Sequence, residues 1–148
     1  MFSVVFPGQG SQSVGMGSDL YKDHTYIKDL FSKANDILGY DIGRLILEGP
    51  EENLNMTEYT QPAIFLVSFS IFEVIKKETE FDIKRAKYFA GHSLGEYSAL
   101  ASLGYIKFEH AIKLLQKRGQ AMQQSVPKGQ GGMIAILGAD IDLSLIHI

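Results

Sequence analysis

The chain of 148 residues is 45% hydrophobic and 21% charged, which predicts one soluble globular unit with an ordinary core. Its net charge of −3 and its dispersed Lys and Arg residues argue against a nucleic-acid-binding surface. The absence of cysteine from the sequence excludes disulfides, thiolate metal sites and a cysteine nucleophile.

The amino terminus and the longest apolar run both argue against export and membrane insertion. Residues 1–6 carry no early positive charge and are followed by Pro7 before an export signal could form. The apolar run 63–75 contains Ser68 and Glu73 and is too short to cross a bilayer. We therefore expect a cytoplasmic protein that has no membrane partner.

The sequence pattern predicts an α/β protein that begins with a strand. A β-prone run covers residues 2–6, and a second apolar strand ends at Ala90. A helix opens near Pro62, which we expect in its first turn. Periodicity predicts helices over residues 23–38, 63–75, 96–103 and 108–124, a short helix or turn over 41–47, and an acidic loop over 48–52.

The glycine-rich loop 7–12 after the first strand invites comparison with a nucleotide-binding loop. It does not fit, because Ser13 stands where the dinucleotide fingerprint needs a third glycine, and no Gly-Lys-Ser/Thr follows. Ligands of open α/β sheets bind outside the carboxyl ends of the strands. If the first strand lies near the one ending at Ala90, Gln9 and Ser93 should face the same crevice.

The stretch Gly91-His92-Ser93-Leu94-Gly95 has the layout of a nucleophile elbow. A serine in a tight strand-to-helix turn has its hydroxyl exposed at the sheet edge, and the two glycines let strand and helix approach. The N–H of Leu94 would lie in the first turn of the helix, where it could stabilise an oxyanion. The alternative is that Ser93 merely caps the helix.

Arg118 falls on the apolar face of the last predicted helix, in the stripe formed by Ala111, Leu115 and Met122. An unpaired buried charge costs several kcal/mol, so this guanidinium requires a carboxylate. The partner could be internal, for example Glu96. It could also arrive with a ligand, in a bidentate pair. A further alternative is that the side chain of Arg118 extends to solvent near a helix end.

Four segments together resemble the malonyl-CoA:acyl carrier protein transacylases, and the order and spacing fit from residue 1 to about 138. These segments are residues 6–12, 60–63, 91–97 and 118–123. The resemblance implies that Ser93 is the nucleophile, that Gln9 and the N–H of Leu94 form the oxyanion hole, and that Arg118, His92 and Gln61 bind the substrate.

The resemblance also implies the reaction and its participants. A malonyl group would pass from CoA, through an acyl-enzyme, to the phosphopantetheine thiol of acyl carrier protein in fatty acid biosynthesis. No cofactor and no metal are implied, and the full-length enzyme is expected to be a monomer. We expect no nucleic-acid partner.

The family's catalytic base is a histidine, and the resemblance places it beyond the end of this chain. His24 and His110 are expected on helix exteriors, and His147 lies in a tail, residues 143–148, that departs from the family pattern. The chain therefore corresponds to an amino-terminal portion, and we expect little or no transferase activity from it alone.

The expected domain organisation has two parts. Residues 1–126 would form the amino-terminal part of a large, parallel-sheet, α/β-hydrolase-like domain. Residues 127–148 would form a linker and the first strand of a small ferredoxin-like subdomain, because 127–132 has a linker composition and 133–137 is β-prone.

Three other functions remain open at this stage. One is an acyltransferase domain of a polyketide or multidomain fatty acid synthase, with the same chemistry on another carrier. Another is a serine esterase of the α/β-hydrolase type, which needs no buried cation. The third is a non-catalytic binding module, which the missing histidine would permit.

Overall fold

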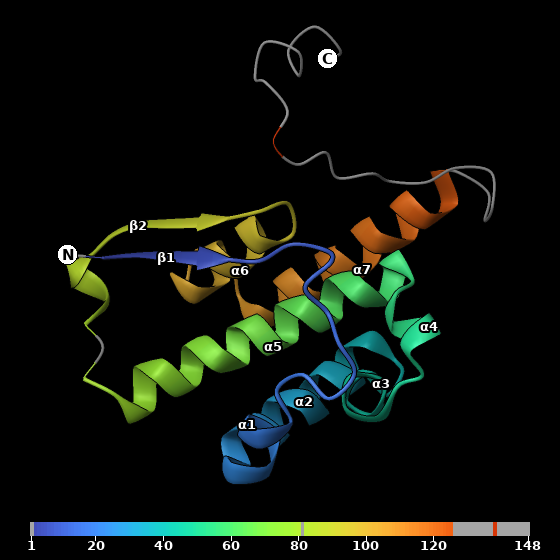
Figure 1. Ribbon diagram of the computed structural model, residues 1–148, viewed down its shortest axis with the longest axis horizontal. Coiled ribbons are helices and arrows are strands. Elements are labelled where there is room, and N and C mark those ends of the chain that lie inside the picture. The colour runs from blue at the N-terminus through green and yellow to red at the C-terminus, as the bar shows by residue number, and fades with distance from the viewer. Residues whose placement is uncertain (1, 81, 126–137, 139–148) are drawn as a thin grey trace, which may run out of the picture.

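The computed structural model describes residues 2–80, 82–125 and 138, and its elements are labelled in Figure 1. In chain order they are β1 (Phe2–Phe6), α1 (Ser18–Asp23), α2 (Thr25–Leu38), α3 (Ile42–Glu48), α4 (Glu51–Leu54), α5 (Thr57–Glu78), a 3-10 turn (Ile83–Arg85), β2 (Ala86–Gly91), α6 (Gly95–Ser102) and α7 (Phe108–Ser125).

The two strands of the described region pair in parallel, which confirms the predicted α/β class with a parallel sheet. Phe6 pairs with Gly91 at the carboxyl end of the ladder, and the N–H of His92 donates to the carbonyl of Phe6 at 3.1 Å. Both strands therefore end at one edge, which brings the loop after β1 beside the turn after β2.

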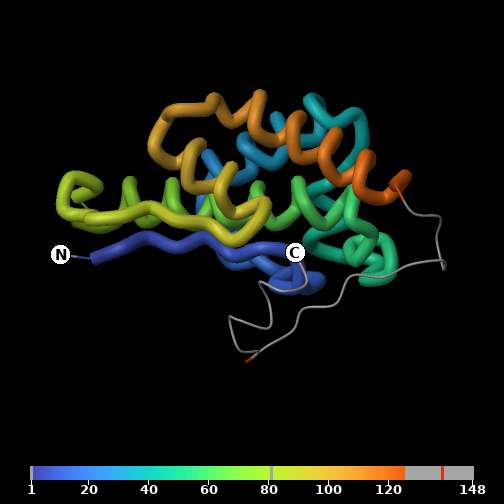
Figure 2. The backbone as a smooth tube through the Cα atoms, turned by 90° about the horizontal axis from the view of Figure 1, so that it is seen from above, coloured from blue at the N-terminus to red at the C-terminus, as the bar shows by residue number. Residues whose placement is uncertain are grey.

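Helix α5 is the central element of the fold, and it contacts α2, α6 and α7 (Figures 1 and 2). It is apolar on nearly all sides, as predicted for an interior helix. Phe65 stacks on Phe108 of α7 with ring centroids 5.5 Å apart. Toward the carboxyl end of α5, Phe72 packs with Phe6 and Phe89 beneath the sheet.

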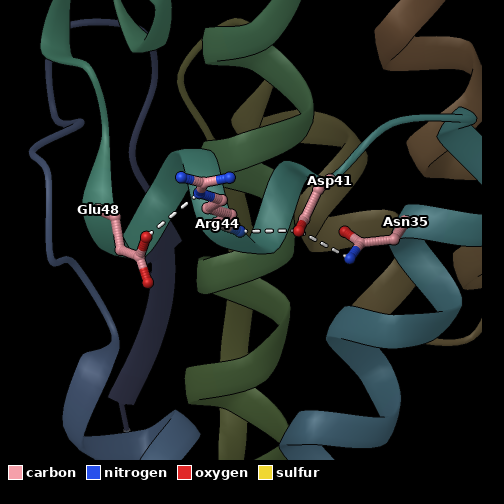
Figure 3. A network of polar contacts seen from close by, with 4 residues as sticks. All are labelled: Asn35, Asp41, Arg44 and Glu48. Carbon is pink, nitrogen blue, oxygen red and sulfur yellow. Dashed lines mark hydrogen bonds and ion pairs between the residues drawn. The ribbon is translucent and has the colours of Figure 1, made fainter.

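A polar network fixes the junction between α2 and α3 (Figure 3). Asp41 precedes α3, and its carboxylate accepts hydrogen bonds from the backbone N–H of Arg44 and from the side chain of Asn35, both at 2.9 Å. Arg44 in turn donates to Glu48 at 3.2 Å. This N-cap explains why the short segment predicted as a helix or turn is helical.

Three predicted boundaries were wrong. The helix expected over 23–38 is α2, which begins at Thr25, because His24 has an extended backbone (φ −122°, ψ 113°) and Asp23 is the last residue of α1. Helix α5 begins at Thr57, so Pro62 lies in its interior rather than in its first turn. The expected acidic loop 48–52 instead contains the end of α3 and the start of α4.

No helix in the described region is long and apolar enough to span a membrane. The predicted strand over 133–137 and the predicted linker over 127–132 lie outside the described residues.

Candidate active site

The turn after β2 has the geometry of a nucleophile elbow. Ser93 has a left-handed backbone (φ 55°), which side chains other than glycine seldom adopt. A Cβ atom on Gly91 would lie 1.9 Å from the carbonyl carbon of Gly95, and one on Gly95 would lie 2.5 Å from the carbonyl oxygen of Phe6. Both glycines are therefore needed where the strand, the turn and α6 meet.

The alternative role of Ser93 as a helix cap does not fit this geometry. The residue at the N-cap position of α6 is Leu94, and no side chain caps the helix. Ser93 is exposed, and its hydroxyl oxygen accepts a hydrogen bond of 3.0 Å from Nη2 of Arg118. The serine therefore faces a cation from α7.

Arg118 is half-buried, and its guanidinium contacts two polar side chains from different elements. Nη1 donates to Oε1 of Gln61 at 2.7 Å, while Nη2 donates to Ser93. Among residues 2–80 and 82–125, no carboxylate forms an ion pair with Arg118; Glu96, the internal partner considered above, is exposed. The positive charge is thus held at the serine by neutral groups.

Gln61 orients that guanidinium from the core. It is only 1% exposed, and both ends of its side-chain amide are engaged. Its Oε1 accepts from Arg118, and its Nε2 lies 3.0 Å from the sulfur of Met122, one turn further along α7. A buried amide satisfied in this way fixes the direction of the Arg118 side chain.

Gly119, next to Arg118, lets α7 approach the start of α5 closely. A Cβ atom at this position would lie 2.7 Å from the carbonyl oxygen of Thr57 and 2.8 Å from Cα of Glu58. This contact was not predicted from the sequence. The only sequence signal is a glycine within an otherwise regular helix, which often marks close packing.

The loop after β1 lies against the elbow, as predicted. A Cβ atom on Gly8 would lie 2.4 Å from Nδ1 and 2.7 Å from the carbonyl oxygen of His92. The side chain of Gln9 donates from Nε2 to Oγ1 of Thr57 at 3.3 Å. Within the described part of the chain, the backbone N–H groups of Gln9 and Leu94 have no hydrogen-bond acceptor.

The histidines of the described region lie in different surroundings. His92 is exposed beside the Gly8 loop. His110 is exposed on α7, as predicted, whereas His24 is half-buried and lies 3.8 Å from Glu78 at the far end of α5. No hydrogen bond joins a histidine of the described region to Ser93, and His147 lies outside that region.

The groups around Ser93 have the chemistry that acyl transfer requires. The described residues contain no cluster of three or more His, Asp or Glu side chains that could hold a metal ion. They place the hydroxyl of Ser93 beside a cation that has no carboxylate partner, and the backbone N–H groups of Gln9 and Leu94, in the adjoining loop and turn, are available as donors. Such groups can position an acidic acyl group and stabilise an oxyanion.

Comparison with known proteins gives consistent results. The family profile described as "Acyl transferase domain" matches residues 3–146. Over 139 residues, 94% of this chain, the sequence is 49% identical to the malonyl CoA-acyl carrier protein transacylase of Haemophilus influenzae. The match covers 44% of that relative, so the chain spans less than half its length.

Solved structures agree with the sequence match. An acyl carrier protein S-malonyltransferase from Vibrio cholerae aligns with a TM-score of 0.79 and 49% identity, covering 86% of this chain and 41% of that one. A chain from the structure of a type II polyketide acyl carrier protein in complex with its malonyl-transacylase aligns with a TM-score of 0.80 and 46% identity. That alignment covers 86% of this chain and 40% of the other. On these grounds, the chain belongs to the acyl transferase domain family.

Proposed function

We propose that this chain supplies the nucleophile and the acyl-binding groups of a malonyl-CoA:acyl carrier protein transacylase. The observation that carries the proposal is the hydrogen bond between Arg118 and Ser93, made by a guanidinium with no carboxylate partner in the described region. A malonyl carboxylate would provide that partner while the thioester carbonyl lies at the serine.

The first half-reaction acylates Ser93. Its hydroxyl oxygen attacks the thioester carbon, the serine proton passes to a base, and the carbon–sulfur bond breaks to release CoA as its thiol. The backbone N–H groups of Gln9 and Leu94 are free to receive the oxyanion, and each such donor contributes about 3 kcal/mol to the transition state. His92 lines the site.

The second half-reaction reverses this chemistry on another thiol. The phosphopantetheine thiol of acyl carrier protein attacks the malonyl ester, and Ser93 leaves as a free hydroxyl. The shared acyl-enzyme predicts ping-pong kinetics. The base for both steps would be a histidine from the remaining part of the domain, so this chain alone should transfer little or no malonate.

The wider expectations belong to the same proposal. We infer that β1 and β2 are part of an α/β-hydrolase-like large domain, with 1–126 as its amino-terminal part and 127–148 leading into a ferredoxin-like subdomain. We propose a cytoplasmic enzyme in fatty acid biosynthesis, monomeric at full length. It would use no cofactor and no metal, and would have no nucleic-acid or membrane partner.

Rival functions differ in what becomes of the acyl group. A polyketide acyltransferase would use the same site with another carrier, in keeping with the polyketide complex described above. A serine esterase would pass the acyl group to water and would gain nothing from Arg118. A binding module would leave Ser93 unreactive toward a serine-directed acylating probe.

The test compares the chain alone with an extended enzyme, in which residues 1–138 are followed by the remaining sequence of the Haemophilus influenzae relative. We expect the extended enzyme to transfer malonyl, and acetyl far more slowly, to acyl carrier protein. Transfer of acetyl at an equal rate, or hydrolysis alone, would refute the malonyl assignment. Rapid stoichiometric acylation of Ser93 in the chain alone would refute the need for an external base.

A further inference from the structure

The start of α5 carries a second polar contact with the site, one turn before Gln61. Thr57 and Gln61 are four residues apart, so their side chains lie on the same face of the helix. Gln61 accepts from Arg118, and Thr57 accepts from Gln9. One helical face therefore contacts both Arg118 and the loop that contains Gln9.

The side chain of Gln9 is engaged in this contact. Its Nε2 donates to Oγ1 of Thr57 at 3.3 Å, and both residues are half-buried. The backbone N–H of Gln9 has no acceptor in the described region. The side chain thus anchors the loop to α5, while the backbone N–H remains available as a donor.

A neighbouring contact shows that the whole loop is fastened to the same segment. Nε2 of Gln12 donates to Oδ1 of Asn55 at 2.8 Å, and Oε1 of Gln12 accepts from the N–H of Gly10 at 2.8 Å. Asn55 stands two residues before Thr57. The hydrogen bond between Gln12 and Asn55 is exposed and adds to the anchor, but the part-buried bond to Thr57 acts directly on Gln9.

We propose that Thr57 is a positioning residue for the oxyanion hole, acting through the side chain of Gln9. An oxyanion donor contributes fully only when its N–H is held about 3 Å from the developing charge, so loosening the loop should slow acylation. Substrate binding at Arg118 should be unaffected. This inference rests on the proposed function, since it assigns a task to Gln9 in that reaction.

The experiment replaces the threonine by its isostere. Thr57→Val removes the acceptor and keeps the shape, while Thr57→Ser keeps the hydroxyl. Thr25→Val is the matched control, because Thr25 is also the first residue of a helix, is exposed, and makes no side-chain hydrogen bond within the described region.

Two readouts separate the inference from the proposed function. Hydrogen exchange of residues 8–12 in the 148-residue chain should be faster in Thr57→Val and unchanged in Thr57→Ser and Thr25→Val. In the extended enzyme, Thr57→Val should lower kcat for malonyl transfer about tenfold with little change in KM, and Thr57→Ser should restore it.

The outcomes are distinguishable. Unchanged exchange in Thr57→Val would overturn the anchor whatever the enzyme's activity. Faster exchange with unchanged kcat would overturn its role in catalysis while leaving the transacylase assignment intact. Loss of malonyl transfer in the wild-type extended enzyme, with the exchange result as expected, would instead refute the proposed function and leave the anchor as a structural contact.

Discussion

Nη2 of Arg118 lies 3.0 Å from Oγ of Ser93, although the two residues belong to different elements and are 25 positions apart. Ser93 has a left-handed backbone at this contact, and α7 packs closely on the start of α5 at Gly119, next to Arg118. It joins the proposed nucleophile to a cation that no carboxylate of the described region neutralises. The following predictions test what this pairing does.

Removing the cation should cost the enzyme its preference for an acidic acyl group. In Arg118→Ala, the kcat/KM of the extended enzyme for malonyl-CoA should fall by about 10-fold to 100-fold, as expected for loss of a charge-assisted hydrogen bond. The rate with acetyl-CoA should change little. Lys113→Ala, which removes an exposed cation of α7, is the control. An equal fall in kcat/KM for malonyl-CoA in that variant would mean that overall positive charge, rather than Arg118 itself, favours the acidic acyl group.

Giving Arg118 an internal partner should have a similar effect by a different route. Gln61→Glu places a carboxylate where the amide oxygen now lies 2.7 Å from Nη1, so the guanidinium would be neutralised before substrate arrives. We expect the malonyl-to-acetyl ratio of kcat/KM to fall at least tenfold. Gln61→Met removes the acceptor without adding charge and should reduce the ratio less. A ratio unchanged in both variants would mean that Gln61 does not orient Arg118.

How much of this site the sequence predicts depends on how local each feature is. The elbow is encoded within five residues by Gly91, Ser93 and Gly95, and the structure has the expected turn. The position of Arg118 on the inner face of α7 follows from helical periodicity alone. Both features could be predicted because neighbouring residues determine them.

The groups that support the site could not be predicted in this way. The contacts of Thr57 with Gln9 and of Gly119 with the start of α5 join segments about 50 to 60 residues apart, so no local pattern reports them. The start of α5 was misplaced because Pro62 favours the first turn of a helix. In the structure, tertiary packing extends α5 to Thr57, more than one turn before Pro62.

Replacing the nucleophile should reveal the strain in its turn. A left-handed backbone costs about 1–2 kcal/mol for residues other than glycine, so Ser93→Gly should relieve it while Ser93→Ala should not. Both variants should lose acylation. In urea unfolding of the 148-residue chain, we expect the glycine variant to be more stable than the alanine variant by about 1 kcal/mol. Equal stability would show that the turn at Ser93 is not strained.

Filling the contact between α7 and α5 should reverse the usual effect of a glycine-to-alanine change. In a helix interior alanine is ordinarily favoured by about 1 kcal/mol, but a Cβ atom at Gly119 would lie 2.7 Å from the backbone oxygen of Thr57. We expect Gly119→Ala to destabilise the chain by about 1–3 kcal/mol in urea unfolding, because neither backbone can yield without moving a helix.

The same substitution should also weaken the site, because moving α7 away from α5 withdraws Arg118 from Gln61 and Ser93. In the extended enzyme the malonyl-to-acetyl ratio should therefore fall in Gly119→Ala. Lys117→Ala, at an exposed position two residues earlier on α7, serves as the control for both measurements. A Gly119→Ala chain as stable as the wild type would mean that the two helices can separate freely, and the close contact would then not be what positions the guanidinium.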